Sequence, residues 1–438
     1  MKILKLLLYP LLGTAIFLFF GQFFPSVKTL GMRIPNPDMA TDYGIAIFWA
    51  IGLLLPIHLF VKNHKERIAT IWIWLGKSCV TLGAMLFYEH NYGLDAYTYY
   101  VVSTQEQAPI YVPFAYTGTQ FIGFFSWHLN HFLPVFDSYH ALKVVYSFIG
   151  LMGSFIFYKA WTTYFDKENT NWLYLLGLFP TVLFWSSILG KDPVVFFAIG
   201  IYSLGTIRLL KTQKLKNLFL IVTGVLLASL IRSWLSFILV APIGMAYLFA
   251  AKIAPLKKII IMGSYLFGII YFSQSFLVNF GIESTSELLD RTNSLSNAWS
   301  IGGSAAKTPE FQSLKDLLMF VPRGVFTALF RPLLGEVNNI FGIVAGLENT
   351  IFLFVFVVSL LKRKRNIERG PVFVWAVTLI LIWAVIYGPI SYQNMGTAVR
   401  FKLQVIPHLL LIIVSLRWNW SKEGEAAATQ PPGAICTS

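Results

Sequence analysis

Long apolar runs alternate with short polar segments along most of this chain. A helix that crosses a bilayer needs about 20 mostly apolar residues. The runs that meet this requirement predict an all-α, polytopic integral membrane protein with about twelve transmembrane helices. The predicted spans are residues 3–22, 44–61, 68–88, 140–160, 172–189, 193–210, 217–231, 234–251, 258–279, 340–361, 371–390 and 401–417.

Two long segments, residues 89–139 and 280–339, interrupt the pattern as outer loops. In the first, the aromatic stretch FAYTGTQFIGFFSWHLNHFLPVF places large apolar side chains near helical spacing, which favours a helix lying in the membrane interface. The second becomes amphipathic at SLKDLLMFVPRGVFTALFRPLLGEVNN. It predicts another interfacial helix, which we expect Pro322 and Pro332 to break into short pieces.

The two ends of the chain differ in pattern. Lys2 and Lys5 precede an apolar run as in a signal peptide, but no small-residue cleavage site follows, so we expect a retained first helix. The last residues, 423–438, are polar and rich in small side chains, which predicts a disordered cytoplasmic tail. Residues 1–422 then form a single transmembrane domain.

The composition is that of a membrane protein, and the distribution of basic residues along the chain explains the net positive charge. The chain is 56% hydrophobic and 12% charged, whereas a soluble domain is roughly 25% charged. A net charge of +14 would suit nucleic acid, but 21 of the 34 Lys and Arg residues fall on one side if the N-terminus is inside. Short loops such as KNHKER and LKRKRNIER follow the positive-inside rule. We therefore expect both termini in the cytoplasm and no nucleic-acid partner.

The sequence offers little for a metal or cofactor site. Cys79 lies in an apolar run and Cys436 in the tail, so neither a disulfide framework nor a cysteine metal site is expected. His90, His128 and His131 leave a metal open, but their setting favours packing at the interface. We expect no cofactor and no metal, and nothing in the sequence supports a divalent ion.

One carboxylate lies among tyrosines directly after the third predicted span, in HNYGLDAYTYY. Asp95 is costly there unless it faces water or a partner. Sugars stack on such rings, so Tyr97 and Tyr99 are candidate substrate-binding residues. Asp95 is the candidate base or orienting acceptor for an acceptor hydroxyl. Capping of a turn by Asp95 remains the alternative.

A second set of charges lies at span ends on the same predicted face as Asp95. Arginine near headgroup depth is costly without an anion, and a pyrophosphate on a lipid carrier lies at that depth. One guanidinium group can bind two oxygens of a pyrophosphate through parallel hydrogen bonds. Such groups would also stabilise the negative charge on a departing pyrophosphate during glycosyl transfer. We take Arg331 and Arg400 as catalytic candidates. The substrate-binding candidates of this set are Lys191, Asp192, Arg232, Glu336 and Lys402.

Structural roles for these charges stay open. Lys191 and Asp192 can pair to close the hairpin between two spans. Arg331 and Glu336 can pair to anchor their loop. Arg400 and Lys402 can bind ordinary anionic headgroups, since membrane lipids are partners of any such chain.

Four short motifs resemble a known family. Gly93, Asp95 and Tyr99 form G-x-D-x-x-x-Y after an early helix, and FPTVLFWSSILGKD, FRPLLGE and GTAVRFKLQVIP follow. Together they resemble bacterial polysaccharide polymerases of the EpsG-like and Wzy (O-antigen polymerase) type. The resemblance implies a glycosyltransferase that joins polyprenyl-pyrophosphate-linked saccharide units at the outer face of the cytoplasmic membrane for exopolysaccharide or O-antigen assembly. It also implies other polysaccharide-assembly proteins as partners.

The polymerases that the chain resembles are related in architecture to C-type membrane glycosyltransferases, whose acid in the first outer loop would correspond to Asp95. In many of those enzymes the acid follows the first helix, whereas here it follows the third. O-antigen ligases use a histidine in their late outer loop, and residues 280–339 contain none, which weakens the assignment to the ligases.

Three alternative functions remain. The chain can be a single-sugar C-type glycosyltransferase using a polyprenyl-phosphate sugar, a transporter or flippase of an anionic glycolipid, or a non-catalytic scaffold. Transporters usually show repeats and polar groups near mid-membrane, whereas these charges gather at one rim. Lys77, inside the third span, is the exception, either lining a cavity or reaching toward an interface.

Overall fold

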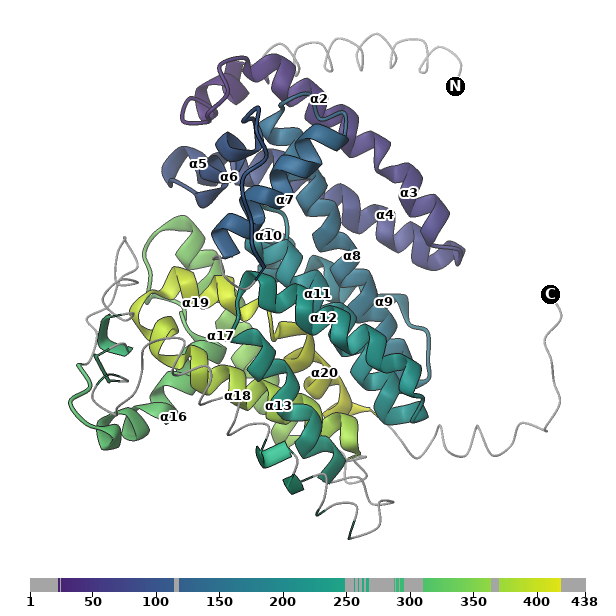
Figure 1. Cartoon of the computed structure of the whole chain (residues 1–438), viewed down its shortest axis with the longest axis vertical. Coiled ribbons are helices and arrows are strands. Elements are labelled where there is room, and N and C mark those ends of the chain that lie inside the picture. The colour runs from purple at the N-terminus through teal and green to yellow at the C-terminus, as the bar shows by residue number, and fades with distance from the viewer. Residues whose placement is uncertain are drawn as a thin grey trace, which may run out of the picture.

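A computed structural model describes residue 23, residues 25–113, 118–248, 310–363 and 370–418, and scattered residues between 256 and 294. The regular elements of this part are all helices, as predicted (Figure 1). They are α2 (Met39–Gly52), α3 (Leu54–Phe60), α4 (His64–Cys79), the π-helical segment η1 (Val80–Ala84), α5 (Met85–Asn91), α6 (Asp95–Ser103), α7 (Gly118–Phe132), α8 (Tyr139–Phe165), α9 (Thr170–Leu178), α10 (Pro180–Trp185), α11 (Lys191–Thr212), the 3₁₀ turn η2 (Leu215–Asn217), α12 (Leu218–Ile231), α13 (Leu235–Leu248), α16 (Leu314–Phe330), α17 (Ile340–Leu361), α18 (Pro371–Gln393), α19 (Met395–Lys402) and α20 (Ile406–Arg417).

Six of the described helical runs are long and apolar enough to cross a membrane, which is the composition of a multi-pass membrane protein. The pair α19 and α20, bent by 65° at the break between them, would make a seventh. Of the other predicted spans, 3–22 lies outside the described residues, and most of 258–279 lies outside them. The six are Met39–Phe60, His64–Asn91, Tyr139–Phe165, Lys191–Thr212, Ile340–Leu361 and Pro371–Gln393.

The predicted span 172–189 is two short helices rather than one. Pro180 has no backbone N–H to give α9 and restricts the residue before it. Phe179 is accordingly extended, with ψ of 124°, and α9 ends at Leu178. After α10, residues 186–190 form a non-helical turn that leads directly into α11.

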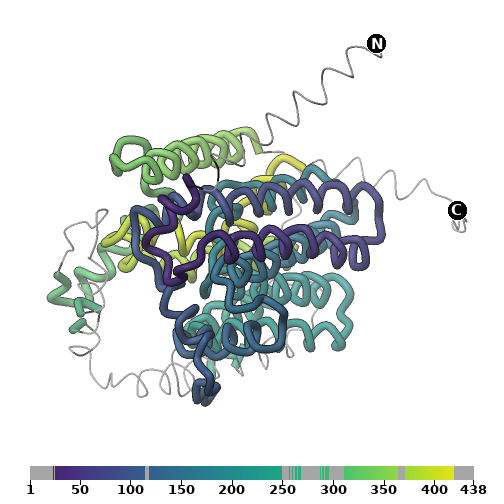
Figure 2. Tube along the Cα trace, turned by 90° about the horizontal axis from the view of Figure 1, so that it is seen from above, coloured from purple at the N-terminus to yellow at the C-terminus, as the bar shows by residue number. Residues whose placement is uncertain are grey.

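Helices α8 and α11 form the centre of the bundle (Figure 1). They are the most buried candidate spans, with 72% and 83% of their apolar windows inside the protein. Close approach is possible because Gly153 and Gly200 face each other; a Cβ on Gly200 would lie 3.3 Å from the Gly153 carbonyl oxygen. By contrast, α17 lies at the edge of the bundle, with 22% of its window buried (Figure 2).

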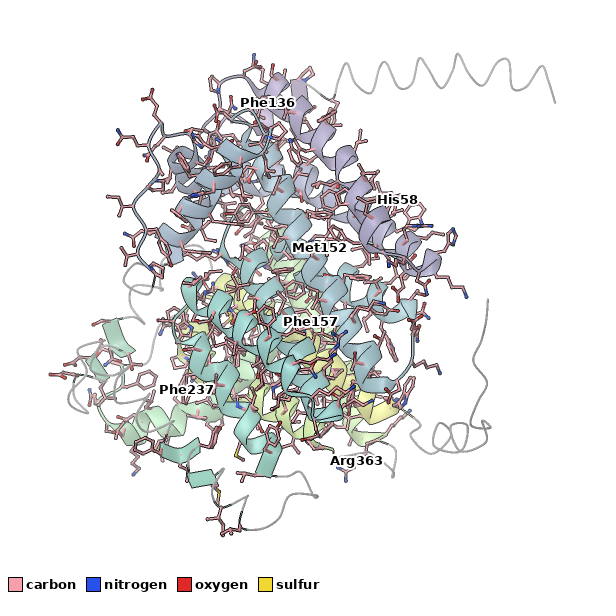
Figure 3. All side chains as sticks on the ribbon, turned by 45° about the vertical axis from the view of Figure 1, so that its right-hand side comes forward. His58, Phe136, Met152, Phe157, Phe237 and Arg363 are labelled. Carbon is pink, nitrogen blue, oxygen red and sulfur yellow. The ribbon has the colours of Figure 1, made fainter. Side chains whose placement is uncertain are left out.

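Polar contacts between helix ends define two ends of the bundle. At one, Lys159 near the end of α8 contacts Glu66 at the start of α4; we call this the Glu66 end. At the other, Arg232 after α12 contacts Asp192 at the start of α11; we call this the Asp192 end. In Figure 3, Phe136 and Phe237 of the Asp192 end lie to the left of His58 and Arg363 of the Glu66 end.

The amphipathic segment predicted within residues 280–339 is helical and forms α16. The expectation that Pro322 breaks it is wrong, because α16 continues through Pro322 and ends only before Pro332. Packing against α18 supports the continuous helix: a Cβ on Gly324 would lie 3.3 Å from the Gly388 Cα. Small residues at such a crossing let two helix backbones touch.

Candidate functional site

Asp192 is the centre of a charged cluster at the Asp192 end. It lies in the first turn of α11, where a helix favours negative charge, and is 2% exposed. One carboxylate oxygen accepts a hydrogen bond from Nη2 of Arg232 at 3.2 Å, and the other accepts from Nε of Arg400. A single buried carboxylate is therefore shared by two guanidinium groups.

Arg232 reaches this carboxylate from the break between α12 and α13. It is the C-cap of α12 in an extended conformation, and it is 5% exposed. Its guanidinium lies 4.3 Å from the ring centre of Phe401, a cation–π contact. Its Nη1 is buried and has no hydrogen-bond partner among the described residues. An unpaired buried donor of this kind is costly.

Arg400 approaches Asp192 from α19. Its Cζ lies 5.7 Å from the ring centre of Trp185, the last residue of α10. Trp185 and Asp192 thus contact the same guanidinium from the two sides of the turn formed by residues 186–190.

Lys191 does not pair with its neighbour Asp192, so the hairpin-closing alternative is wrong. Its Nζ donates to the hydroxyl of Thr119, at the start of α7, at 2.8 Å. Adjacent residues on a helix point about 100° apart, which follows from 3.6 residues per turn. Lys191 therefore adds a third cation from the side of α7.

Asp95 is exposed as the first residue of α6, and no side chain caps that helix. Tyr99, one turn later, connects it to the cluster. Burial raises the pKa of Tyr99, the charge of Asp95 raises it further, and the charge of Arg400 opposes both. The structure therefore brings together Asp95, Tyr99 and the cluster around Asp192.

Tyr97 lies on a different face of α6. Its hydroxyl donates to the Glu89 carbonyl oxygen at 3.3 Å, and its ring contacts Tyr139 of α8. Burial, followed by the charge of Glu89, raises the pKa of Tyr97 to about 12. Tyr97 thus faces the interior between α5 and α8, away from the contacts that define the cluster.

The remaining predicted residues form a separate group. Lys402 is fully buried and donates to Asn349 of α17 at 2.7 Å and to the Arg331 carbonyl oxygen at 3.1 Å. Arg331 itself pairs with Glu336, with Nε at 2.7 Å from the carboxylate. Glu336 also accepts from the backbone N–H of Leu333. These contacts match the structural role left open for the pair.

The structure adds buried charges that the sequence reading did not treat as functional. Glu89 accepts from Lys143 at 2.8 Å and from Tyr139 at 2.8 Å, with both charges within the bundle. Asp42 accepts from His140 in a second buried pair. Lys143 and Glu89 lay at the edges of predicted spans, and a search for charges near span ends would have found them.

The contacts of His128 and His131 do not support the alternative that the histidines bind a metal ion. Nδ1 of His128 lies 2.8 Å from the Phe124 carbonyl oxygen, and His131 stacks on Trp127. No group of three His, Cys, Asp or Glu side chains with metal-binding geometry occurs within the described ranges.

The cluster carries three cations, Lys191, Arg232 and Arg400, and two carboxylates, Asp95 and Asp192. Guanidinium donors around a buried centre can bind an anion with several oxygens. The exposed carboxylate beside them can accept a proton or orient a hydroxyl. The chain matches no protein-family model, no curated protein and no solved structure.

Proposed function

We propose that this chain is a membrane glycosyltransferase of the polymerase type, which joins polyprenyl-pyrophosphate-linked saccharide units at the outer face of the bacterial cytoplasmic membrane. The observation that carries the proposal is the shared carboxylate: Arg232 and Arg400 both bind Asp192, and one buried guanidinium donor has no partner. An oxygen of a bound pyrophosphate would accept the hydrogen bond that Nη1 of Arg232 lacks.

The charge of the cluster fits an anionic leaving group. Three cations against two carboxylates leave an excess positive charge, and preorganised donors act most strongly where negative charge develops. Asp192 holds both guanidinium groups in place before substrate arrives. Lys191, half-buried beside Thr119, contributes a further positive charge to the same cluster.

Asp95 takes the role of base in this proposal. It is exposed, so an acceptor sugar can reach it, and Tyr99 feels the charges of both Asp95 and Arg400. In the transfer, the acceptor hydroxyl gives its proton to Asp95, the new glycosidic bond forms, and the bond to the pyrophosphate breaks with its electrons leaving on the pyrophosphate.

The orientation also belongs to the proposal. The Glu66 end would be cytoplasmic, because its loops carry many of the lysine and arginine residues. The Asp192 end would then face outward, with its ring of aromatic and basic side chains at headgroup depth. Both termini would lie in the cytoplasm.

The test is mass spectrometry of lipid-linked saccharides from cells that lack this chain, restored with wild type, Arg400→Gln or Arg208→Gln. Arg208 is an exposed arginine on α11 near the Glu66 end and serves as the matched control. We expect single repeat units to accumulate with Arg400→Gln and long polymer to return with Arg208→Gln. Normal polymer length with Arg400→Gln would contradict the proposal.

A transporter of an anionic glycolipid is the second candidate. Two observations favour it: the 65° break between α19 and α20, and the buried Glu89–Lys143 pair inside the bundle. Broken helices and buried charges are typical of transporters. The two candidates differ in a detergent extract of cells that lack this chain, supplied with lipid-linked units and followed by the same mass spectrometry. If the chain is a transporter, the extract still forms polymer. If the chain is the polymerase, the extract forms none.

A further inference from the structure

Lys77 is a fully buried lysine in the middle of the span formed by α4, η1 and α5. Its Nζ lies 2.9 Å from the Ser186 carbonyl oxygen, 2.6 Å from the Ser186 hydroxyl and 3.0 Å from the Ser187 hydroxyl. In the described part of the chain no carboxylate forms an ion pair with it. It does not reach toward an interface, as one sequence alternative had it.

The hydrogen bonds of the two serines fix the role of Lys77 as a donor. The Ser186 hydroxyl donates to the Val182 carbonyl oxygen, and the Ser187 hydroxyl donates to the Leu183 carbonyl oxygen. Each hydroxyl has one proton, so both are left to accept from Lys77. The three acceptors around Nζ match the three N–H donors of an ammonium group.

The position of this ammonium group suits its charge. Ser186 is the C-cap of α10, and a cation is favoured where helix carbonyl groups are exposed at a C-terminus. On the opposite side of the turn, α8 approaches at Gly150. A Cβ on Gly150 would lie 2.1 Å from the Ser186 carbonyl oxygen. The carbonyl is therefore held between a lysine of one helix and a glycine of another.

This turn connects the two residues that contact Arg400. Trp185 lies immediately before it and Asp192 shortly after it. A shift of the turn would move the aromatic ring and the carboxylate together, and the guanidinium groups of Arg232 and Arg400 would lose their common anchor.

We propose that Lys77 is a positioning residue of the anion site, which fixes the turn of residues 186–190 so that Asp192 meets Arg232 and Arg400. The inference rests on the proposed function, since it assumes that the cluster binds pyrophosphate. Lys77 acts through the turn and touches no substrate.

The experiment is a calorimetric titration of the full chain in detergent with inorganic pyrophosphate. Lys77→Met removes the donor from the side of α4, and Gly150→Ala displaces the same carbonyl from the side of α8. We expect each to raise the Kd by about 10-fold or more with unchanged stoichiometry. The control is Thr70→Val on α4. Thr70 is buried, and among the described residues its hydroxyl donates only to the Glu66 carbonyl oxygen. We expect the Kd of this variant to stay within twofold of wild type.

The readout separates positioning from general destabilisation. Loss of folded protein lowers the stoichiometry of binding, whereas a displaced cluster raises the Kd of the molecules that remain folded. If Lys77→Met does not yield folded protein, Gly150→Ala and Ser187→Ala carry the test. A wild-type Kd in those variants would overturn the inference.

Arg232→Gln and Arg400→Gln are titrated in parallel to keep the two proposals apart. If these variants lose pyrophosphate binding while Lys77→Met and Gly150→Ala keep it, the positioning role is wrong and the anion site stands. If the arginine variants bind pyrophosphate as wild type does, the proposed function itself fails.

Discussion

The two ends of the bundle hold buried charge in different ways. At the Glu66 end, one carboxylate accepts from Lys159 at 2.7 and 2.8 Å and from the Tyr158 hydroxyl at 2.9 Å. Lys159 remains 30% exposed, so its charge still reaches water. At the Asp192 end, one carboxylate serves two guanidinium groups, and Nη1 of Arg232 has no partner in the described chain.

The difference separates a structural pair from an incomplete site. A pair of one acid and one base is neutral and needs nothing more. Two arginines share one aspartate, Arg232 buried at 6% side-chain exposure and Arg400 partly buried at 22%. They leave a positive charge that is costly in an apolar setting unless another anion arrives. The Asp192 end is therefore the end at which a ligand has a physical reason to bind.

The largest effect should come from removing the shared carboxylate. We expect Asp192→Asn to lower the free energy of unfolding by about 3 kcal/mol or more, because the buried guanidinium group of Arg232 and the partly buried one of Arg400 lose their counter-charge. Glu66→Gln should cost about 1 kcal/mol, since Lys159 can turn to water and a hydrogen-bond acceptor remains. Unfolding in detergent, followed by circular dichroism, measures both.

Added pyrophosphate sharpens this comparison. A ligand that binds only the folded state adds stability, about 2.7 kcal/mol at a concentration 100 times its Kd. We expect pyrophosphate to restore part of the stability of Asp192→Asn, by replacing the lost carboxylate, so that its gap to wild type narrows. Glu66→Gln keeps the anion site, so pyrophosphate should stabilise it as much as wild type and leave its gap to wild type unchanged. Equal losses in the two variants, with neither gap narrowed by pyrophosphate, would remove the distinction between the ends.

A smaller effect is expected from Arg232→Lys. Lysine keeps the charge but cannot bind two oxygens in parallel or lie flat on the Phe401 ring. We expect turnover of lipid-linked units to fall by about 10-fold, less than the loss of a whole transition-state donor. Arg208→Lys near the Glu66 end is the control, and a drop of the same size there would show that the effect is not local.

The apolar pattern predicted the helices where a run is uninterrupted. The expected span 340–361 has the bounds of α17, and 193–210 falls within α11. The prediction of one span over 172–189 was wrong, because mean hydropathy does not register that Pro180 lacks a backbone N–H. The apolar pattern also could not show that Pro322 lies in a continuous helix, which depends on the packing of Gly324 against α18.

For the site, the sequence placed the charges at one rim but not their partners. Asp192 binds arginines 40 and 208 positions away, and such pairs are decided by how α11, α12 and α19 pack. Lys191, adjacent in sequence, points elsewhere. Tyr97 and Tyr99 look equivalent in the tyrosine-rich stretch HNYGLDAYTYY, yet their spacing on α6 turns them toward different neighbours.

The exposed ion pair of the Glu66 end should matter little. Lys211 contacts Asp166, whose side chain is 79% exposed, and also donates to the Thr163 carbonyl oxygen at 2.9 Å. Exposed pairs contribute up to about 1 kcal/mol. We expect Lys211→Met to lower the free energy of unfolding by no more than that and to leave pyrophosphate binding unchanged. A loss comparable to that of Asp192→Asn would contradict the contrast between a solvated pair and a buried one.

The smallest effect concerns pH at the Asp192 end. The pKa of Tyr97 is about 12 in the folded chain and roughly 10 for an unperturbed tyrosine. Between these values the unfolded chain has released the proton and the folded chain has kept it, so the free energy of unfolding falls as pH rises. Tyr97→Phe removes one such proton, and we expect a shallower decline of the melting temperature with pH between about 10 and 12. Below pH 9 the difference between variant and wild type should not change with pH, since both states keep the proton; an unchanged slope above pH 10 would show that Tyr97 releases its proton as readily in the folded chain as in the unfolded one.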